Sequence, residues 1–585
     1  MLRELHTYYN PTMDSTLPQL EESKSEMDNE EILEEDTAEI ALISTMSGGR
    51  DPLTFDEAWN HPDPTERHLW RKAIQKEFGD MKKRNVWKII SKDKVPPNRR
   101  LIGCKWVFKV KRDNTHRARL LALGYSQIPG VDFTENYAPV VDDETIKLVL
   151  EASHLMNLSG ELIDIETAFL YGELEEDIYM TVPEGLEHFE EIPDNCCCNL
   201  LGIIYGLVQA SRQFFKKFVK FLKGTLHFEH SPADPCLLTK YDPKLGQMFT
   251  MVYVDDGAIF GKEEARAWIK REVKKEFNIK EGGLIRNYLG VSVIRTPSGY
   301  LLHQKDTIEK MERLFGPSVK DLRSYATPMA PGYTVIRPKE GEPVMEAIEQ
   351  SKYRSGVGML NYLVKHTRPD LCNAVRELLK VLDKGTPQHL KDMYRTIKYV
   401  LDTKWRALRI EPTKIPQNPK KDWIIEIYVD SDYAGDKDTR RSVTGYTIYV
   451  NGVLIAPKSR LQKTVSLSSC EAEYKATTDR CNEVQFIRQL LESMGITVRY
   501  PIPMYIDNVG AMFLGNNQCS TRTKHIDVRH HYICELIDQN IIKLIFVRTD
   551  KNFADYYTKN VSGERFTAYY DTLFEDIEEK EETKN

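Results

Sequence analysis

Hydrophobic and polar residues alternate along the chain in two rhythms, which predict a mixture of helices and strands. The spacing of amphipathic helices starts near Phe55 and returns at 143–158, 206–224, 265–279 and 350–404. Between these segments lie short runs rich in Val, Ile, Tyr and Phe, a composition typical of strands. The pattern therefore predicts a fold of the α+β or α/β class.

Two segments have the pattern of strand pairs. KWVFKVKRDNTHRARLLALGY, at 105–125, predicts two strands around a short Asp-Asn turn, with a high density of Lys and Arg. MFTMVYVDDGAIFG, at 248–261, predicts two apolar strands that flank a tight acidic turn. Past residue 421, three strands, a helix at 471–495 and a further strand predict a separate compact α/β domain.

The length of 585 residues is too great for one hydrophobic core and predicts several domains. A segment rich in Pro and Gly, 326–343, is the best internal linker, and PTKIPQNPKKD gives a second one before residue 423. We find no apolar run of the length that a membrane span needs and no secretory signal segment. We therefore expect a soluble intracellular protein with reduced cysteines.

The net charge of −7 argues against a polyanionic partner, but its distribution reverses this interpretation. Residues 1–50 carry a net charge of −9 and residues 571–585 a net charge of −5, which leaves +7 on 51–570. Blocks of like charge usually stay solvated, so we expect acidic, disordered ends. The remaining core is weakly basic and compatible with nucleic acid.

Adjacent carboxylates at the acidic turn are the most informative feature. Asp255 and Asp256 repel each other between apolar strands unless cations neutralise them. Asp164 ends another apolar run 91 residues before Asp255, and two neighbouring strands would bring these acids together. Such a group can hold two Mg²⁺ ions for phosphoryl transfer. A solvated acidic hairpin tip is the alternative.

These motifs resemble the reverse transcriptase of copia-type LTR retrotransposon Pol polyproteins. The resemblance is carried by YVDD, DIETAF, IYGLVQASRQFF and NYLG, and it extends in order over roughly 51–560. It implies a right-hand polymerase with fingers, palm and thumb, followed by a helical connection and an RNase H-like domain. It also implies that Asp164, Asp255 and Asp256 bind Mg²⁺, with Asp256 the less directly coordinating of the adjacent pair.

The resemblance implies further contacts with the substrate. Phe169 matches the bulky ring that excludes a ribose 2′-hydroxyl, although a core aromatic residue is the alternative. Basic residues would grip the triphosphate of the incoming nucleotide, although an exposed basic strand face explains them nearly as well: Lys109, Lys111 and Arg119. Tyr205 and Gly206 match the segment that packs on nucleotide and template. Tyr288 and Gly290 match the primer grip, although a plain strand-to-turn segment explains them as well.

A second set of acids lies in the C-terminal domain, at strand ends and on helices: Asp430, Glu473, Asp507 and Asp555. The resemblance implies an RNase H centre in which these four residues bind two Mg²⁺ ions, or Mn²⁺ in their place. Glu471 is a rival for the role of Glu473, which we prefer because EYKA, at 473–476, fits the family pattern.

Two other patterns imitate metal sites. The run of Asp residues after Asp430 imitates a calcium-binding loop, but Arg441 occupies the twelfth position, where an EF-hand needs Glu. Another group suggests a zinc site, but its context, TRTKHIDVRHHYICE, resembles a helix of RNase H: Cys519, His525, His530, His531 and Cys534. Within that helix, His525 and His531 would pack or face the substrate.

The domain plan that follows has six parts: an acidic leader (1–50), fingers and palm (51–260), a thumb-like region (261–330), a linker and helical connection (331–420), an RNase H-like domain (421–562) and an acidic tail (563–585). The expected partners are an RNA template, a DNA primer and product, RNA–DNA hybrid, dNTPs, and other Gag and Pol products of the element, with no membrane. We expect a cytoplasmic particle with a nuclear stage left open. The alternative function is a catalytically inactive relic that binds nucleic acid.

Overall fold

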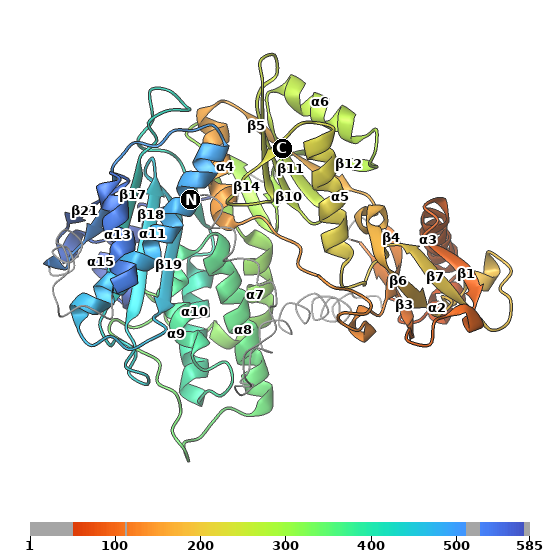
Figure 1. The fold of residues 1–585 in the computed structure, drawn as a ribbon. Helices are drawn as coiled ribbons and strands as arrows, with labels where there is room; N and C mark the ends of the chain where they lie inside the picture. Colours follow the sequence, from red (N-terminus) through yellow and green to blue (C-terminus); the bar gives the residue numbers. More distant parts are fainter. Residues whose placement is uncertain (1–50, 112–113, 510–526, 578–585) are drawn as a thin grey trace, which may run out of the picture. The chain divides into compact units, whose positions relative to one another are not determined.

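The computed structural model describes residues 51–111, 114–509 and 527–577, with side chains of 527–531 excepted (Figure 1). The chain divides into two compact units. The N-terminal unit comprises the described residues up to Thr134 together with Leu174–Val208, and the large unit comprises Glu135–Glu173 and the chain from Gln209 onward. Within the described residues, no helix combines the length and the hydropathy that crossing a bilayer requires.

The N-terminal unit is built on the long helix α3. Asp63 caps its first turn by accepting hydrogen bonds from the backbone N–H groups of Thr65 and Glu66. Trp70, Ile74 and other apolar residues at helical spacing are buried on one face. The elements are α2 Phe55–Trp59, α3 Pro64–Lys83, β1 Trp87–Ser91, β2 Leu101–Ile102, β3 Cys104–Val110, β4 His116–Ala122, β6 Glu173–Met180 and β7 Cys196–Gly202.

Two sheets complete this unit. One sheet has the order β1-β7-β6-β2, and β3 and β4 form a separate antiparallel ribbon in which Cys104 lies opposite Ala122. The ribbon confirms the strand pair expected at 105–125. Trp106, Phe108 and Leu120 are buried, so every second residue of the ribbon faces the core.

The large unit begins with a six-stranded sheet, which we call the central sheet, in the order β12-β5-β11-β10-β9-β8. Its core residues fall into two groups: Ile163 and Ile259 pack with α5 and α6, whereas Phe249 and Phe260 share a cluster with α4 (Figure 1). The elements are α4 Asp143–Leu155, β5 Ser159–Ile165, α5 Ala210–Gly224, β8 Glu229–His230, β9 Leu237–Asp242, β10 Gly246–Tyr253, β11 Asp256–Gly261, α6 Glu263–Val273 and β12 Ile279–Leu284.

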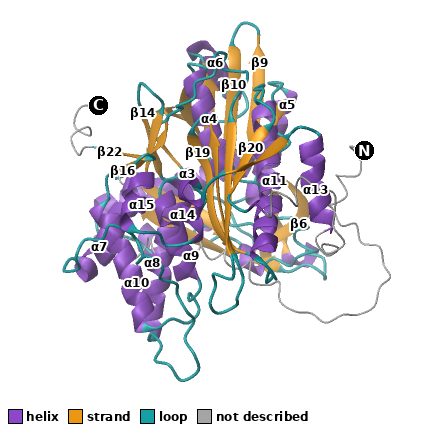
Figure 2. Ribbon diagram, turned by 90° about the vertical axis from the view of Figure 1, so that its left-hand side faces the viewer, coloured by secondary structure: helices purple, strands orange, loops and turns teal. Residues whose placement is uncertain are grey.

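A second sheet, the connecting sheet, follows in the order β13-β14-β15-β16-β22. Helices α7, α8, α9 and α10 pack together next to it in the large unit (Figure 2). The elements are β13 Asn287–Tyr288, β14 Val291–Arg295, β15 Tyr300–His303, α7 Lys305–Val319, α8 Ala347–His366, α9 Cys372–Leu379, α10 Pro387–Asp402, β16 Arg406–Ile410 and β22 Phe574–Asp576. The segment 326–343, expected as a linker, contains no helix or strand.

The C-terminal sheet has the order β19-β18-β17-β20-β21, with β17, β18 and β19 antiparallel and β17, β20 and β21 parallel. This mixed sheet, packed against α11, confirms the α/β domain expected after residue 421. Its elements are β17 Ile425–Asp432, β18 Val443–Val450, β19 Val453–Leu461, α11 Ser469–Ser493, β20 Ile502–Ile506, α13 Asp527–Asp538, β21 Ile542–Phe546, α14 Asp555–Thr558 and α15 Gly563–Tyr570.

The segment after residue 562 differs from the solvated tail expected there. Gly563–Tyr570 forms α15, which buries Phe566, Tyr569 and Tyr570, and Phe574 then pairs with Leu408 of β16. The free energy gained by burying these aromatic side chains outweighs the gain from solvating the neighbouring acids. A count of charges does not include the aromatic contribution. Of the expected tail, the structure describes residues up to 577, and this part belongs to the fold.

Candidate active sites

The central sheet brings the first group of acids to one edge. Asp164 at the end of β5 is the register partner of Asp256, the first residue of β11. Because directly opposed residues on antiparallel strands share a face, both side chains project from the same side of the sheet. Tyr253 also pairs with Asp256, which leaves Val254 and Asp255 as the turn. The backbone N–H of Ile165 donates to the Asp255 carbonyl at 3.1 Å, fixing this turn to β5.

The turn that carries Asp255 is strained. Val254 has φ +49°, a left-handed conformation that a β-branched residue adopts at a cost of about 1–3 kcal/mol. Gly257, directly after the acids, has no room for a side chain, since a Cβ there would lie 2.8 Å from Cγ1 of Ile163. Strain and close packing of this kind occur where the position of a functional group is fixed by its surroundings.

The electrostatics of this group favour a cation. Asp256 is exposed at the start of β11. Desolvation first, and then the charges of Asp255 and Asp164, raise the pKa of Asp256 to about 6. A divalent cation would relieve the same repulsion by neutralising the carboxylates.

Phe169 lies close to these acids along the chain. It belongs to a short 3-10 helix, Ala168–Tyr171, that begins after Thr167 in a left-handed conformation with φ +54°. Its ring is half-buried and packs against the core that contains Ile163 and Ile165. The short helix that carries Phe169 packs on α5, in the core that also contains residues of β5.

Tyr288 and Gly290 belong to a tight hairpin between β13 and β14. Tyr288 pairs with Val291, and the turn residues Leu289 and Gly290 have φ +51° and +73°. Tyr362 donates from its hydroxyl to the Leu289 carbonyl at 2.9 Å and lies so close that a Cβ on Gly290 would be 2.6 Å from it. The hairpin therefore requires glycine at position 290 and is held by α8.

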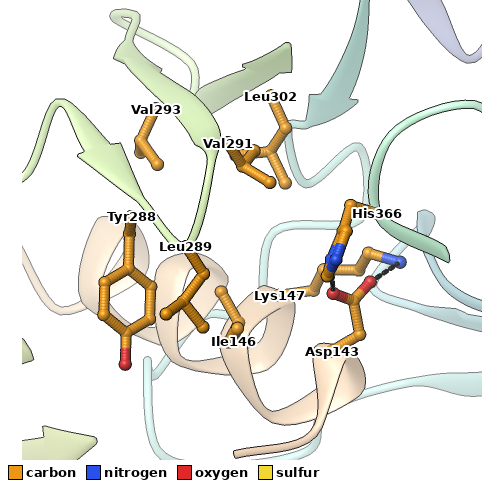
Figure 3. A pocket seen from close by; sticks show the side chains of 9 residues that line it. All are labelled: Asp143, Ile146, Lys147, Tyr288, Leu289, Val291, Val293, Leu302 and His366. Atoms are coloured by element: carbon orange, nitrogen blue, oxygen red, sulfur yellow. Dashed lines mark hydrogen bonds and ion pairs between the residues drawn. The ribbon is translucent and has the colours of Figure 1, made fainter. Parts of the chain in front are cut away.

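Tyr288 itself is buried, with 4% of its surface exposed. Burial raises the pKa of its hydroxyl strongly, and the nearby charge of Asp256 adds to the effect. Below the hairpin lies a small apolar cavity that Ile146, Leu289 and Val293 help to line (Figure 3).

The basic residues expected to bind nucleotide lie in the N-terminal unit. Lys109 and Arg119 are on the face of the β3–β4 ribbon opposite to its buried residues, together with Lys105 and Arg117, and exposed Lys111 follows β3. The ribbon therefore concentrates cations on one face, as a polyphosphate site requires.

Tyr205 and Gly206 pack directly on this ribbon. The guanidinium of Arg119 stands 3.8 Å from the centre of the Tyr205 ring, a cation–π contact. Gly206 has φ +87°, and a Cβ there would lie 2.2 Å from the Ala122 carbonyl. Glycine is therefore required where the chain passes the end of β4.

The second group of acids forms a compact cluster. Asp430 lies on β17, Glu473 on α11 and Asp507 directly after β20, and one carboxylate oxygen of each lies within 4.8 Å of the others. Neighbouring placement of β17 and β20 in the C-terminal sheet explains how residues far apart in sequence meet. The cluster contains three of the four residues predicted for this centre.

The donor atoms of this cluster suit a metal ion. Glu473 accepts from the backbone N–H of Ser431 through Oε1 at 3.0 Å, and its buried Oε2 has no hydrogen-bond partner among the described residues. Burial raises the pKa of Asp430 to about 7 and that of Glu473 well above its usual range, and mutual repulsion adds to both shifts. Three carboxylates with an unpartnered buried oxygen are hard ligands that a divalent cation would stabilise.

Glu471, the rival of Glu473, has a different environment. Its carboxylate forms an ion pair with Lys475 at 2.8 Å and accepts from the backbone N–H of Leu467 at 2.8 Å. These contacts fix the first turn of α11 and lie outside the cluster of three acids.

Asp555, the fourth predicted acid, is fully buried but lies outside that cluster. It is held between two cations, forming one ion pair with Lys559 and another with Arg565 at 3.0 Å. Thr558, on the same short helix, donates from its hydroxyl to Asp430 at 2.6 Å. The helix α14 therefore contacts the cluster through Thr558 and carries Asp555 beside it.

Three residues around Asp555 and Asp430 were not predicted as part of the site: Thr558, Lys559 and Arg565. The spacing of Lys559, four residues after Asp555 in a helical segment, was the available signal for that ion pair. Arg565 carried no such signal, because its contact depends on α15, where a solvated tail was expected. Among the residues whose pattern suggests a zinc site, Cys519 and the side chains of His525, His530 and His531 lie outside the described part of the structure.

Comparison with known families identifies related sequences. A profile of the family described as reverse transcriptase (RNA-dependent DNA polymerase) matches residues 84–331. The retrovirus-related Pol polyprotein from transposon TNT 1-94 of Nicotiana tabacum is 33% identical over 533 residues, which cover 89% of this chain and 39% of that relative. The corresponding polyprotein from transposon RE1 of Arabidopsis thaliana is 30% identical over 504 residues, covering 85% and 33%.

This chain therefore spans between a third and two fifths of these relatives' length. Among solved structures, a foamy viral protease-reverse transcriptase in complex with RNA/DNA hybrid matches 93% of this chain and 65% of that chain, at 12% identity and a TM-score of 0.44. That score is too low to add to what the sequence relatives show.

Proposed function

Because the chain belongs to the family of copia-type retrotransposon Pol polyproteins, we propose that it copies RNA into DNA and degrades the RNA of the resulting hybrid. The observation that carries the polymerase activity is the register of Asp164 opposite Asp256, with Asp255 in the adjoining turn. These residues lie inside the segment that matches the reverse transcriptase family.

In this proposal, Asp164 and Asp255 bind Mg²⁺ directly and Asp256 supports them. Two bound Mg²⁺ ions would stabilise the attacking and leaving oxygens of in-line phosphoryl transfer. Phe169 limits the space at the sugar of the incoming nucleotide, which excludes a ribonucleotide. Tyr288 and Gly290 hold the primer end through the rigid hairpin that Tyr362 supports.

The N-terminal unit supplies the grip on the triphosphate. Lys109, Lys111 and Arg119 offer cationic donors on one face of the ribbon. Arg119 is pre-oriented by its stacking on Tyr205, and Gly206 allows the chain to approach the ribbon closely. Preorganised charge of this kind lowers the cost of binding a flexible polyphosphate.

For the nuclease, Asp430, Glu473 and Asp507 would hold two metal ions together with Asp555, which lies beside the cluster of three acids. Thr558 orients Asp430 through its hydroxyl. Mg²⁺, with Mn²⁺ as a substitute, is the proposed cofactor, because hard carboxylate oxygens select such ions.

The domain boundaries follow the same proposal: fingers and palm in 51–260, a thumb-like region in 261–330, a linker and helical connection in 331–420 and the nuclease in 421–562. The proposed partners are RNA template, DNA primer and product, hybrid, dNTPs and other Gag and Pol products, in a cytoplasmic particle with a nuclear stage left open.

Two assays with the full chain test the proposal. Primer extension on poly(rA) with oligo(dT), dTTP and Mg²⁺ should give DNA products, and a uniformly labelled RNA–DNA hybrid should be cut. A folded protein that yields neither product would exclude the proposed enzyme and favour a nucleic-acid-binding relic.

A further inference from the structure

One face of helix α4 is polar although it is buried. Asp143, Lys147 and Glu151 occur at intervals of four residues, which aligns their side chains on one side of the helix. Lys147 and Glu151 have 4% and 0% of their surface exposed. Buried charged groups at helical spacing need partners from the elements packed against the helix.

The first partner comes from the helical connection. His366, the last residue of α8, lies 2.5 Å through Nδ1 from Oδ1 of Asp143, and Lys147 forms an ion pair with the other Asp143 oxygen at 3.1 Å (Figure 3). Burial alone would raise the pKa of Asp143, but Lys147 and His366 outweigh it and lower that pKa. Asp143 therefore ties α4 to the C-terminal end of α8.

The other partners come from the C-terminal sheet. Lys147 donates from Nζ to the carbonyl of Ile455 on β19 at 3.2 Å. Asn451, in the turn between β18 and β19, donates from Nδ2 to Oε1 of Glu151 at 2.8 Å. Burial raises the pKa of Glu151 well above its usual range, and the hydrogen bond from Asn451 opposes this shift. These contacts give partners to Nζ of Lys147 and Oε1 of Glu151, which would otherwise be buried without them.

Asn451 is itself fixed in place. Its Oδ1 accepts from the backbone N–H of Ile424 at 3.0 Å, and its backbone carbonyl accepts from the backbone N–H groups of Thr413 and Lys414. It adopts φ +46°, a conformation that Asn tolerates better than most residues. The turn that reaches α4 is therefore a rigid part of the C-terminal sheet.

Further contacts between these parts lie away from the polar face of α4. Thr239 of β9 donates from its hydroxyl to the carbonyl of Ser493 at the end of α11, at 2.8 Å, and Lys420 donates to the side chain of Gln247 at 2.7 Å. One hydrophobic cluster also includes Leu148 of α4 and Ile487 of α11. The central sheet and the C-terminal sheet are therefore joined by apolar and polar contacts at more than one place.

One acid of each group lies a short way from this interface, either along the chain or across one strand pair. Three residues separate α4 from β5, the strand that carries Asp164. On the other side, Asn451 directly follows β18, and Gly445 of β18 is the register partner of Asp430. Packed elements therefore connect Asp164 to Asp430: β5 is followed back to α4, α4 contacts the β18–β19 turn, and β18 pairs with the strand that carries Asp430.

We propose that the polar face of α4 fixes the spacing of the polymerase and nuclease centres, and thereby the position at which RNA is cut behind the primer end. This inference rests on the proposed function. Asp143, Lys147, Glu151 and Asn451 are positioning residues that touch neither metal nor substrate. Cleavage occurs at one distance from the primer end because one rigid body presents both centres to the same hybrid.

The test uses the full chain and a 5′-labelled RNA annealed to a shorter DNA primer with a defined 3′ end. Wild type should give one dominant cut at a constant distance from that end. Lys147→Met combined with Asn451→Gly should scatter the cuts and lower the ratio of the dominant product to all others by about tenfold, which corresponds to about 1.4 kcal/mol. Glycine keeps the left-handed backbone at position 451.

The matched control is Glu151→Gln, whose amide oxygen can still accept from Asn451 and which should keep the wild-type pattern. Primer extension and cutting of a long hybrid without a primer end report the separate activities. If the double variant retains both activities and its dominant cut is unchanged, the inference is wrong. Scattered cuts in wild type would also overturn it, while leaving the proposed function intact.

A double variant that lost both activities would be examined by hydrogen exchange, alongside Lys147→Met alone. The inference predicts faster exchange in α4 and in the β18–β19 turn together, because each protects the other. Unchanged exchange in either variant would overturn it. Absence of both activities in wild type would defeat the proposed function itself.

Discussion

Asp164 and Asp256 are directly opposed on neighbouring antiparallel strands, although 92 positions separate them in the sequence. The pairing of β5 with β11 brings two carboxylates to one face of the central sheet, and the turn adds Asp255. Desolvation, and then the charges of Asp255 and Asp164, raise the pKa of Asp256 to about 6. This arrangement supports the proposal that the acids at this edge bind a cation.

Replacing an acid at this edge should remove polymerisation while the fold persists. Asp164→Asn keeps the size of the side chain but removes a charge, and we expect primer extension to fall by at least about a hundredfold, the scale of losing one transition-state stabiliser. Hybrid cleavage should stay near the wild-type rate. Glu166→Gln, an exposed neighbour, is the control and should extend primers normally.

The hairpin that carries Tyr288 should be sensitive to a single methyl group. Gly290→Ala introduces a Cβ where φ is +73° and where Tyr362 Oη would be 2.6 Å away. We expect a loss of about 1–3 kcal/mol in the free energy of unfolding and weaker binding of a primer–template. Adding Tyr362→Phe removes the clash but not the backbone strain, so recovery should be partial. Full stability in Gly290→Ala would contradict the turn geometry.

In the N-terminal unit, Glu77 predicts a dependence of stability on pH. Burial raises the pKa of Glu77 to about 7, although the backbone N–H of Leu120 donates to it at 3.2 Å. A carboxyl with a raised folded-state pKa binds more protons in the folded state than in the unfolded state between its two pKa values. Stability should therefore fall as pH rises from about 4.5 to about 7, by up to about 1.4 kcal/mol per pH unit.

Glu77→Gln keeps the acceptor for Leu120 and removes the titration. Hydrogen exchange of peptides from α3 and β4, compared between variant and wild type at each pH, measures the difference. Above pH 7, amides of the variant should exchange more slowly than those of wild type. At pH 5 the difference in exchange rate should be small. Equal protection of variant and wild type at pH 8 would show that the folded protein does not bury Glu77 as a charged carboxylate.

Around the nuclease cluster, Lys559 should be needed most when metal is absent. Lys559→Met leaves buried Asp555 with Arg565 as its remaining ion-pair partner. We expect the metal-free protein to lose about 1–3 kcal/mol of stability, less than for a fully buried pair because Lys559 is partly exposed. Thermal melts should show that Mg²⁺ restores part of the loss, whereas Lys559→Arg should melt like wild type. No recovery with Mg²⁺ would separate Asp555 from the metal site.

The sequence predicted the parts of the fold that depend on local pattern. The apolar runs on both sides of Asp255 predicted β10 and β11, and the helical spacing at 143–158 predicted α4 within a few residues. The pairing of Asp164 with Asp256, by contrast, depends on strand order, which periodicity does not encode. Its prediction required a hypothesis about function.

Long-range contacts account for what was missed. Arg565 reaches Asp555 because α15 packs through Phe566 and its tyrosine neighbours, while the charge of the region predicted a solvated tail. Asn451 meets Glu151 because two sheets dock, and neither residue stands out in the sequence. Such contacts form between elements distant in the chain, so a local pattern carries no signal for them.

The most direct test of the account compares Asp255→Asn and Asp507→Asn in the same two assays with Mg²⁺. Asp255→Asn should abolish primer extension on an RNA template and leave hybrid cleavage intact, and Asp507→Asn should do the reverse. This crossed result is expected because each carboxylate belongs to a different acid group. Full primer extension by Asp255→Asn would contradict the central claim that the acidic turn is the polymerase centre.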